Sequence, residues 1–362
     1  MADFFEIDFL DVETAKSGDA ITMRYEKDGV TRIHVVDGGF QSTGDAVIAH
    51  INKYYGNPTK IHHVVATHPD GDHAGGLRKV LEEFDVGALW MLRPWQYAAE
   101  LLPRFSKFTS VDNLRKRLRE VYPNLDALEE IALRKGIPIY EPFQGVSIGA
   151  FTVMAPTRTR YLDLVVDSER TPEAVDEASE QRAGLLLPEG ARKTVARVVN
   201  FVKGAWGVEV FSTQPTSAEN EMSVIQFAVL ADKKVLLTAD AGRQALSEAA
   251  DFAPTISLTL PGIDRFQVPH HGSRRNVSTE VLDRWLGAPA KERPAQATFS
   301  AIISSAKADK DHPRKAVVRA MIHRGASVAC TEGKTICSYQ NSPDRGWVAS
   351  TLMDYPDEQE ED

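Results

Sequence analysis

A short run near residue 70 gathers residues that could bind metal ions. The segment THPDGDHAGGL holds four metal-competent side chains within six positions, namely His68, Asp70, Asp72 and His73. Imidazole nitrogens combined with carboxylate oxygens suit zinc, manganese or iron better than calcium. A helix cap at Asp72 would explain one of these residues, but it would not explain four of them at this spacing. The run therefore predicts a metal site.

Two later segments offer further ligands. LLTADAG places Asp240 directly after an apolar strand, where a carboxylate is costly unless it is paired or metal-bound. VPHHGSRRNVS places His270 and His271 just after another strand. Taken singly, each of these residues fits an ordinary turn or surface position equally well. Together with the earlier run, they supply a bridging carboxylate and a third imidazole.

The elements that must position these residues alternate between strands and helices. Strand patterns are expected at 4–12, 20–25, 31–36, 61–67, 137–140, 151–155, 222–230, 234–238, 265–268, 301–304, 327–331 and 335–339. Helical or polar segments lie between them, so we expect an α/β fold, an αββα sandwich of two similar halves. The ligands follow strands and should meet at one edge. We expect one domain over 1–362, with helical insertions at about 94–135 and 157–215 and a solvated acidic tail at about 355–362.

Composition narrows the class of protein. The 362 residues include 42 Lys+Arg and 51 Asp+Glu, which gives a net charge of −9. This charge disfavours a protein that coats nucleic acid. An enzyme that acts on nucleic acid would have to bind it in a local basic cleft. No apolar run approaches the roughly 20 residues of a membrane span, and the acidic N-terminus does not resemble a secretory signal. The 2 cysteines exclude a disulfide framework and a four-thiolate zinc site. We expect a cytoplasmic protein with no membrane contact.

In motif order the sequence resembles the metallo-β-lactamase-fold hydrolases, and within them the soluble hydrolase domain of ComEC-type competence proteins. The superfamily's H-x-H-x-D-H loop occurs in that branch with Asp in place of the second His, as in His68-Pro-Asp70-Gly-Asp72-His73. The further matching elements are LDVETAKSGDAI, VVDGG, ENEMSVIQF, LLTADA, PHHGS, DHP and TEG. They run in family order from Leu10 to about Ile336 and so cover most of the chain.

The resemblance implies two divalent metal ions, zinc or manganese, and a role for each site residue. One ion would bind His68 and Asp70, the second would bind Asp72, His73 and His270, and Asp240 would bridge them. Asp72 and His271 would be catalytic. Asp37 would not bind a metal itself but would orient a residue that does. The residues expected to contact substrate are Ser273, Arg274, Arg275 and His312.

Two features depart from the family pattern. The superfamily usually supplies another metal-binding histidine after the His-rich loop, but this chain has no histidine between His73 and His270. Another group, a water molecule or nothing takes that position. The membrane channel that accompanies the ComEC hydrolase domain is also absent from the sequence, so DNA uptake is not expected to be the task of this chain.

Three functions remain open on the sequence. The first is a phosphodiesterase or nuclease acting on nucleic acid or nucleotide, favoured by the resemblance and by Arg274 and Arg275 beside the PHHGS loop. The second is a small-molecule hydrolase of a lactone, thioester or cyclic nucleotide, for which an acidic surface is no handicap. The third, ranked last, is a metal-stabilised non-enzymatic protein that binds a protein partner through its inserted helices. The oligomeric state is not predicted.

Overall fold

A computed structural model describes residues 3–12, 14–171 and 201–360 of the chain. Within this part of the chain, two seven-stranded sheets form the centre of the molecule. The first sheet has the order β17 (Ile336–Gln340), β1 (Phe4–Phe9), β2 (Ala20–Lys27), β3 (Val30–Gly38), β5 (His63–Val65), β7 (Leu89–Trp90) and β8 (Ile139–Tyr140). The second has the order β16 (Ala326–Cys330), β15 (Phe299–Ile303), β14 (Arg265–Gln267), β13 (Lys233–Leu237), β12 (Ile225–Leu230), β10 (Phe151–Ala155) and β9 (Ser147–Ile148).

The two sheets share a pattern. In each sheet one part is antiparallel and the other is parallel: β3, β5, β7 and β8 run parallel in the first sheet, and β13, β14, β15 and β16 run parallel in the second. Polar loops that follow the carboxyl ends of parallel strands meet at one edge of a sheet, where open α/β sheets place their ligands. The predicted fold class of two packed sheets with helices outside is therefore confirmed.

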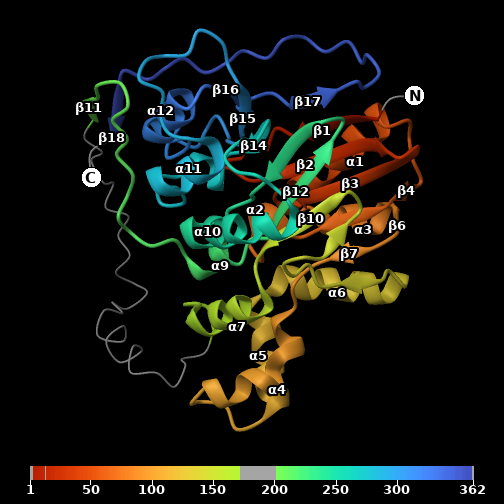
Figure 1. Cartoon of the computed structure of the whole chain (residues 1–362). Helices are drawn as coiled ribbons and strands as arrows, with labels where there is room; N and C mark the ends of the chain where they lie inside the picture. Colours follow the sequence, from red (N-terminus) through yellow and green to blue (C-terminus); the bar gives the residue numbers. More distant parts are fainter. Residues whose placement is uncertain (1–2, 13, 172–200, 361–362) are drawn as a thin grey trace.

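Helices cover the outer faces of both sheets (Figure 1). The helices beside the first sheet are α1 (Gly44–Tyr54), α2 (Gly71–Ala74), α3 (Leu77–Glu83) and α6 (Pro123–Lys135). The helices beside the second are α10 (Arg243–Phe252), α11 (Thr279–Leu286) and α12 (Lys315–His323). One apolar core joins the first sheet to the inner face of the second, and another fills the space between the second sheet and α10, α11 and α12.

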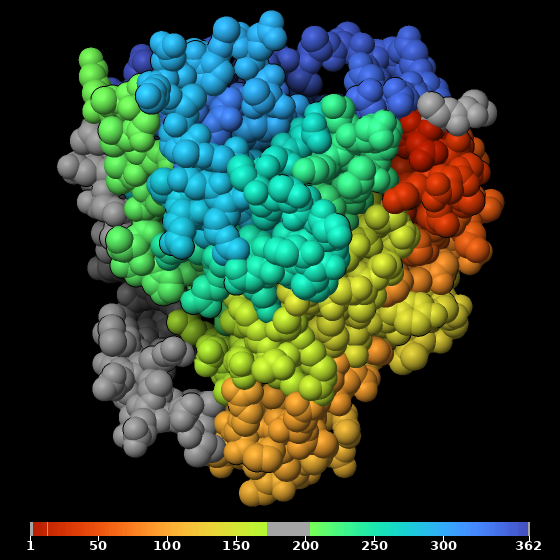
Figure 2. Space-filling model, viewed as in Figure 1, coloured from red at the N-terminus to blue at the C-terminus, as the bar shows by residue number. Residues whose placement is uncertain are grey.

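Residues 94–135 form the helices α4 (Ala98–Leu101), α5 (Val111–Val121) and α6, together with two short 3₁₀ turns. In Figure 1 and Figure 2, α4 and α5 project from the two-sheet body. Leu114 and Leu118, one helical turn apart on α5, are fully buried. The buried carboxylate of Glu129 on α6 accepts hydrogen bonds from Arg93 Nη1 and Trp95 Nε1, both at 3.0 Å, and this fixes the base of the projection.

In its described residues, 157–171 and 201–215, the second predicted insertion is only partly helical. Helix α7 (Arg158–Asp167) opens it, and the short helix α9 (Ala218–Glu221) follows its expected end. Residues 172–200 lie outside the described part. The prediction of helix up to residue 215 is wrong at its end, because β11 (Phe201–Lys203) is a strand that pairs with β18 (Glu358–Glu360).

The prediction of a solvated acidic tail is also wrong. Glu360 is 3% exposed, and its carboxylate accepts hydrogen bonds from the backbone N–H groups of Lys315 (2.8 Å) and Ala316 (3.0 Å). These are the first N–H groups of α12, and a helix leaves its first four N–H groups without intrahelical partners. An acidic residue near the C-terminus is therefore used as a helix cap. Among the described helices, none combines the length and apolarity that crossing a bilayer requires.

Candidate metal centre

The predicted ligands come together where four parallel strands end. The loop after β5 carries His68, Asp70, Asp72 and His73, the residues after β13 carry Asp240, and those after β14 carry His270 and His271. The loop after β15 brings His312. At the turn between α2 and α3, a Cβ on Gly76 would lie 2.0 Å from the Gly38 carbonyl oxygen, so only glycine lets this loop pack onto the end of β3.

One donor group consists of Asp72, His73 and His271, whose ligand atoms lie within 4.8 Å of one another. His73 Nε2 lies 3.2 Å from Asp240 Oδ1, and His271 Nε2 lies 3.9 Å from the same oxygen. This arrangement differs from the expectation, which put His270 with Asp72 and His73. The cause is the tight turn at residues 270–272, which directs the second imidazole toward β15, where His271 Nδ1 donates to the Ser304 carbonyl at 2.8 Å.

A second set of donors faces the other oxygen of Asp240. His68 Nε2 lies 3.9 Å and His270 Nε2 lies 3.6 Å from Asp240 Oδ2. Asp70 Oδ2 lies 3.8 Å from His68 Nε2. Asp240 thus stands between the two sets with one oxygen toward each.

Three imidazoles are held in the protonation form that can bind a metal. His73 Nδ1 donates to Asp37 Oδ2 at 2.8 Å, and His271 Nδ1 donates to Ser304. His68 Nδ1 lies 3.0 Å from Thr67 Oγ1, which itself donates to Asp37 Oδ2 at 2.6 Å, so the imidazole donates to the hydroxyl. An acceptor at each Nδ1 favours, in the neutral ring, the tautomer that leaves the Nε2 lone pair for a metal, as in metal-ligating histidines whose other nitrogen is hydrogen-bonded.

The atoms that face the centre lack hydrogen-bond partners. Nε2 of His68, His73 and His271 and Oδ1 of Asp240 are buried and unpaired within the described residues. A buried polar atom left unpaired costs about 1–3 kcal/mol, so four of them around one point fit the presence of a cation. The residues therefore suit the divalent metals that the sequence predicts.

The electrostatics of the cluster also favour positive charge at its centre. Burial alone would lower the pKa of His271, but the negative charge of Asp240 and its contact with Asp72 raise that pKa to about 9. Burial would likewise raise the pKa of Asp72, but the ion pair with His271, at 3.9 Å, and the nearby His73 lower it to about 2. Carboxylates that stay ionised in a buried pocket attract either protons on histidines or metal cations.

The backbone is strained at the site. Asp37, Ala239, His270 and His271 have φ angles of 57°, 46°, 48° and 55°, in the left-handed region that non-glycine residues seldom adopt. Such residues persist only where the surrounding structure holds them, and they cluster at functional sites. Here three of them position proposed ligands or their supports, and Ala239 directly precedes Asp240.

Several supporting residues were not predicted as part of the site. Asp19 is buried, its Oδ2 lies 3.9 Å from His73 Nδ1, and it forms a metal-competent group with His73 and Asp240. Asn276 Nδ2 donates to the Asp240 carbonyl at 2.8 Å, and Asn276 Oδ1 lies 2.9 Å from His270 Nδ1. The GDA segment of the family pattern contained Asp19 and was the available signal for it. No sequence signal identified Asn276.

His312 stands beside the metal ligands, and its ring stacks on His270 with centroids 5.5 Å apart. Its Nδ1 donates to Asp309 Oδ2 at 3.2 Å. The same carboxylate accepts from the backbone N–H and the hydroxyl of Ser17 at 3.1 and 2.8 Å. An imidazole oriented by a buried carboxylate keeps its other nitrogen available for substrate.

The other predicted substrate-binding residues form hydrogen bonds within nearby segments of the same chain. Arg274 Nη1 donates to the Val210 carbonyl at 3.3 Å. Ser273 Oγ accepts from the backbone N–H of Arg275 at 3.3 Å, within the turn itself. The guanidinium found against a carboxylate of the metal loop is that of Arg170, whose Nη1 lies 2.7 Å from Asp70 Oδ1.

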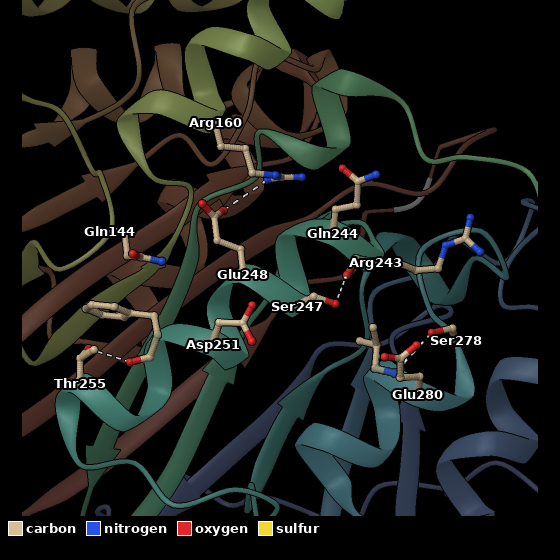
Figure 3. A pocket seen from close by; sticks show the side chains of 12 residues that line it. Gln144, Arg160, Arg243, Gln244, Ser247, Glu248, Asp251, Thr255, Ser278 and Glu280 are labelled. Atoms are coloured by element: carbon tan, nitrogen blue, oxygen red, sulfur yellow. Dashed lines mark hydrogen bonds and ion pairs between the residues drawn. The ribbon is translucent and has the colours of Figure 1, made fainter.

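A cavity of about 830 Å³ lies elsewhere, on the outer side of α10 (Figure 3). None of the predicted site residues lines it. Of its two arginines, Arg160 lies 3.4 Å from Glu248 and pairs with Glu221 at 2.6 Å, and Arg243 donates to the Ser212 and Gln214 carbonyls. We do not assign this cavity to the metal centre.

Comparisons with known proteins give a family for part of the chain. Residues 25–138 match the family described as "Metallo-beta-lactamase superfamily", and this stretch includes the His68–His73 loop. A search of curated proteins found no match. Among solved structures, the chain is similar to a candidate metallo-beta-lactamase of Thermotoga maritima, at 10% identity and a TM-score of 0.31, over 71% of this chain and 93% of that one.

A second similar structure is metallo-beta-lactamase SMB-1 bound to 2-mercaptoethanesulfonate. It shares 10% identity at a TM-score of 0.30, over 71% of this chain and 78% of that one. The match over residues 25–138 supports the presence of a metallo-beta-lactamase superfamily domain in this chain, and members of that superfamily are generally metal-dependent hydrolases.

Proposed function

We propose that this protein is a metal-dependent phosphodiesterase or nuclease whose Asp240-centred cluster holds two divalent cations, zinc or manganese. The observation that carries the proposal is the set of three buried imidazoles, His68, His73 and His271, which each present an unpaired Nε2 toward one carboxylate. Without a metal, only protons on the imidazoles would compensate the charge of Asp240.

The two donor sets divide the ligands between the cations. His68, Asp70 and His270 would hold one ion and Asp72, His73 and His271 the other, and Asp240 would bridge them. A bound pair of such ions activates water and stabilises the charge that develops on a phosphoryl or carbonyl oxygen.

Three further side chains would orient a ligand, the reacting water or the substrate. Asp37 fixes the imidazole of His73 by accepting a hydrogen bond from its Nδ1–H, so that Nε2 stays available for a ligand bond. Asp72, at the start of α2, would serve as a ligand and would orient the reacting water. His312, held by Asp309, would donate to a non-bridging oxygen of the substrate.

Support for a phosphodiester substrate comes from the resemblance to the ComEC-type hydrolase domain and from His312, a hydrogen-bond donor beside the metal ligands. The net charge of −9 is the observation that favours the alternative, a small-molecule hydrolase of a lactone, thioester or cyclic nucleotide. The two functions share the metal cluster and differ in the substrate that reaches it.

A substrate panel tests the proposal. Purified protein loaded with zinc or with manganese would be assayed against bis-p-nitrophenyl phosphate, single-stranded and double-stranded DNA, RNA, a lactone and a thioester. We expect phosphodiester cleavage that is lost in Asp240→Asn and kept in Asp251→Asn, which changes an exposed carboxylate on α10. Hydrolysis of the lactone or thioester without any phosphodiester cleavage would establish the alternative function. A salt series would add a second criterion, because polyanion binding weakens steeply as salt rises.

A further inference from the structure

We propose that Arg170 is the anion-binding residue of the metal centre. Its guanidinium would hold the outer oxygen of Asp70 and, at the same time, take a negatively charged oxygen of the substrate. The identity of that substrate as a phosphodiester rests on the proposed function, whereas binding of an anion at this place does not.

The geometry places Arg170 at the edge of the cluster. Arg170 Nη1 lies 2.7 Å from Asp70 Oδ1, while the other oxygen of Asp70 lies 3.8 Å from His68 Nε2. Asp70 therefore has one oxygen toward the arginine and the other toward the centre. The Arg170 side chain is 45% exposed, so a molecule that approaches the metal ligands can reach it.

The segment that carries Arg170 is fixed to the wall of the site. The backbone N–H of Arg170 donates to Ser168 Oγ at 3.1 Å, and the hydroxyl of Ser168 donates to Glu219 Oε1. Glu219 belongs to α9, and its neighbour Asn220 lies 2.8 Å from His270 Nδ1 through its side-chain nitrogen. Arg170 Nε is itself 3.7 Å from Glu219 Oε1. The arginine is thus anchored to the element that supports a proposed ligand.

The chemistry of the guanidinium suits this double role. Arginine carries five N–H donors in a rigid plane, so a contact with one carboxylate oxygen leaves donors for a second anion. Planar pairing with phosphate is a common use of this group. The sequence predicts Arg274 and Arg275 for this task, but the guanidinium of Arg274 donates to the Val210 carbonyl.

The test compares Arg170→Ala and Arg170→Lys with Arg158→Ala. Arg158 is a matched control because it lies on the preceding helix α7, is 47% exposed and pairs with Glu100 rather than with the metal loop. Three quantities are measured on metal-loaded protein: the Kd for inorganic phosphate by calorimetry, the bound metal by elemental analysis, and KM and kcat for bis-p-nitrophenyl phosphate.

We expect Arg170→Ala to raise the phosphate Kd and the KM about tenfold or more, because a hydrogen bond to a charged group is lost. Arg170→Lys should show a smaller rise, since it keeps the charge and loses the planar fork. Metal content should match the wild type in both variants, kcat should change less than KM, and Arg158→Ala should behave as wild type.

Two results would overturn the inference. One is a phosphate Kd in Arg170→Ala within about twofold of the wild-type value. The other is loss of bound metal in Arg170→Ala, which would make the arginine a support for Asp70 alone. If the wild type cleaves no phosphodiester but its phosphate affinity still depends on Arg170, the proposed function fails and the anion-binding inference stands.

Discussion

Replacement of Asp37 by asparagine should weaken metal binding without unfolding the protein. Asp37 is 1% exposed, and its carboxylate accepts three hydrogen bonds, two from Thr67 and one from His73 Nδ1. Asparagine has nearly the same shape and tolerates the left-handed φ of 57° at this position. The exchange therefore alters chemistry more than packing.

The expected magnitude follows from the tautomer of His73. An amide can offer N–H donors where Oδ2 now accepts, and His73 Nδ1 would then have to accept a hydrogen bond and carry its proton on Nε2. That nitrogen faces Asp240 Oδ1 at 3.2 Å and could no longer ligate a metal. Losing such a support costs roughly 10–100-fold in metal affinity, or about 1.4–2.8 kcal/mol.

The assay is a competition between the protein and a chromophoric chelator for zinc and for manganese, accompanied by thermal unfolding of the metal-free protein. The control is Asp45→Asn, which removes a carboxylate that is 76% exposed on α1 and pairs with Lys79. We expect weaker metal binding in Asp37→Asn alone. Metal affinity within about twofold of the wild type, with the fold intact, would refute the role given to His73 and Asp37.

Three further predictions concern catalysis, the C-terminal strand and acid stability. Asp309→Asn should lower kcat about tenfold or more at unchanged metal content, because His312 loses the carboxylate that orients it; an unchanged kcat in steady-state assays would contradict this. Glu360→Ala should destabilise the protein by roughly 1–3 kcal/mol in denaturant unfolding, because two N–H groups of α12 lose their acceptor. Burial lowers the pKa of His34 well below 6.5 and that of His63 to about 4. The free energy of unfolding of the metal-free protein should therefore be constant above pH 6.5 and should fall by roughly 1–3 kcal/mol toward pH 4. The reason is that these histidines bind protons in the unfolded chain at a higher pH than in the folded one.

Matched variants separate these effects from general damage. Asp311→Asn changes an exposed carboxylate two residues from Asp309 and should leave kcat unchanged. Glu358→Gln changes a half-exposed residue of the same strand as Glu360 and should leave stability nearly unchanged. A midpoint of unfolding that does not move between pH 6.5 and 4 would contradict the assignment of buried neutral histidines.

The metal loop could be predicted because its ligands are neighbours in the sequence. Four metal-competent residues within six positions reveal themselves without any tertiary structure, and the two sheets follow from the strand pattern. The sequence could not predict which of His270 and His271 joins which donor set. The two residues are adjacent, and the left-handed backbone at both positions decides where each imidazole points. A strand pattern carries no information about such a turn.

Other features depend on contacts between distant segments. Asp309 acquires its role from Ser17, 292 positions away, and Arg170 reaches Asp70 from the end of α7. The sequence predicts Glu360 in a solvated tail, because acidic runs at chain ends are usually exposed to solvent. Pairing with Phe201–Lys203 and the free N–H groups of α12 bury it instead. Composition indicates how exposed such residues usually are, and tertiary contacts determine how exposed they are in this protein.

The most direct test of the central claim is a titration of metal-free protein with manganese or zinc while hydrolysis of bis-p-nitrophenyl phosphate is followed. If the cluster around Asp240 is a two-metal hydrolytic centre, the chelator-treated protein is inactive, and activity rises with added metal to a plateau near two equivalents. Equal activity in the chelated and the loaded protein, or no hydrolysis of this substrate at any metal concentration, would contradict the account.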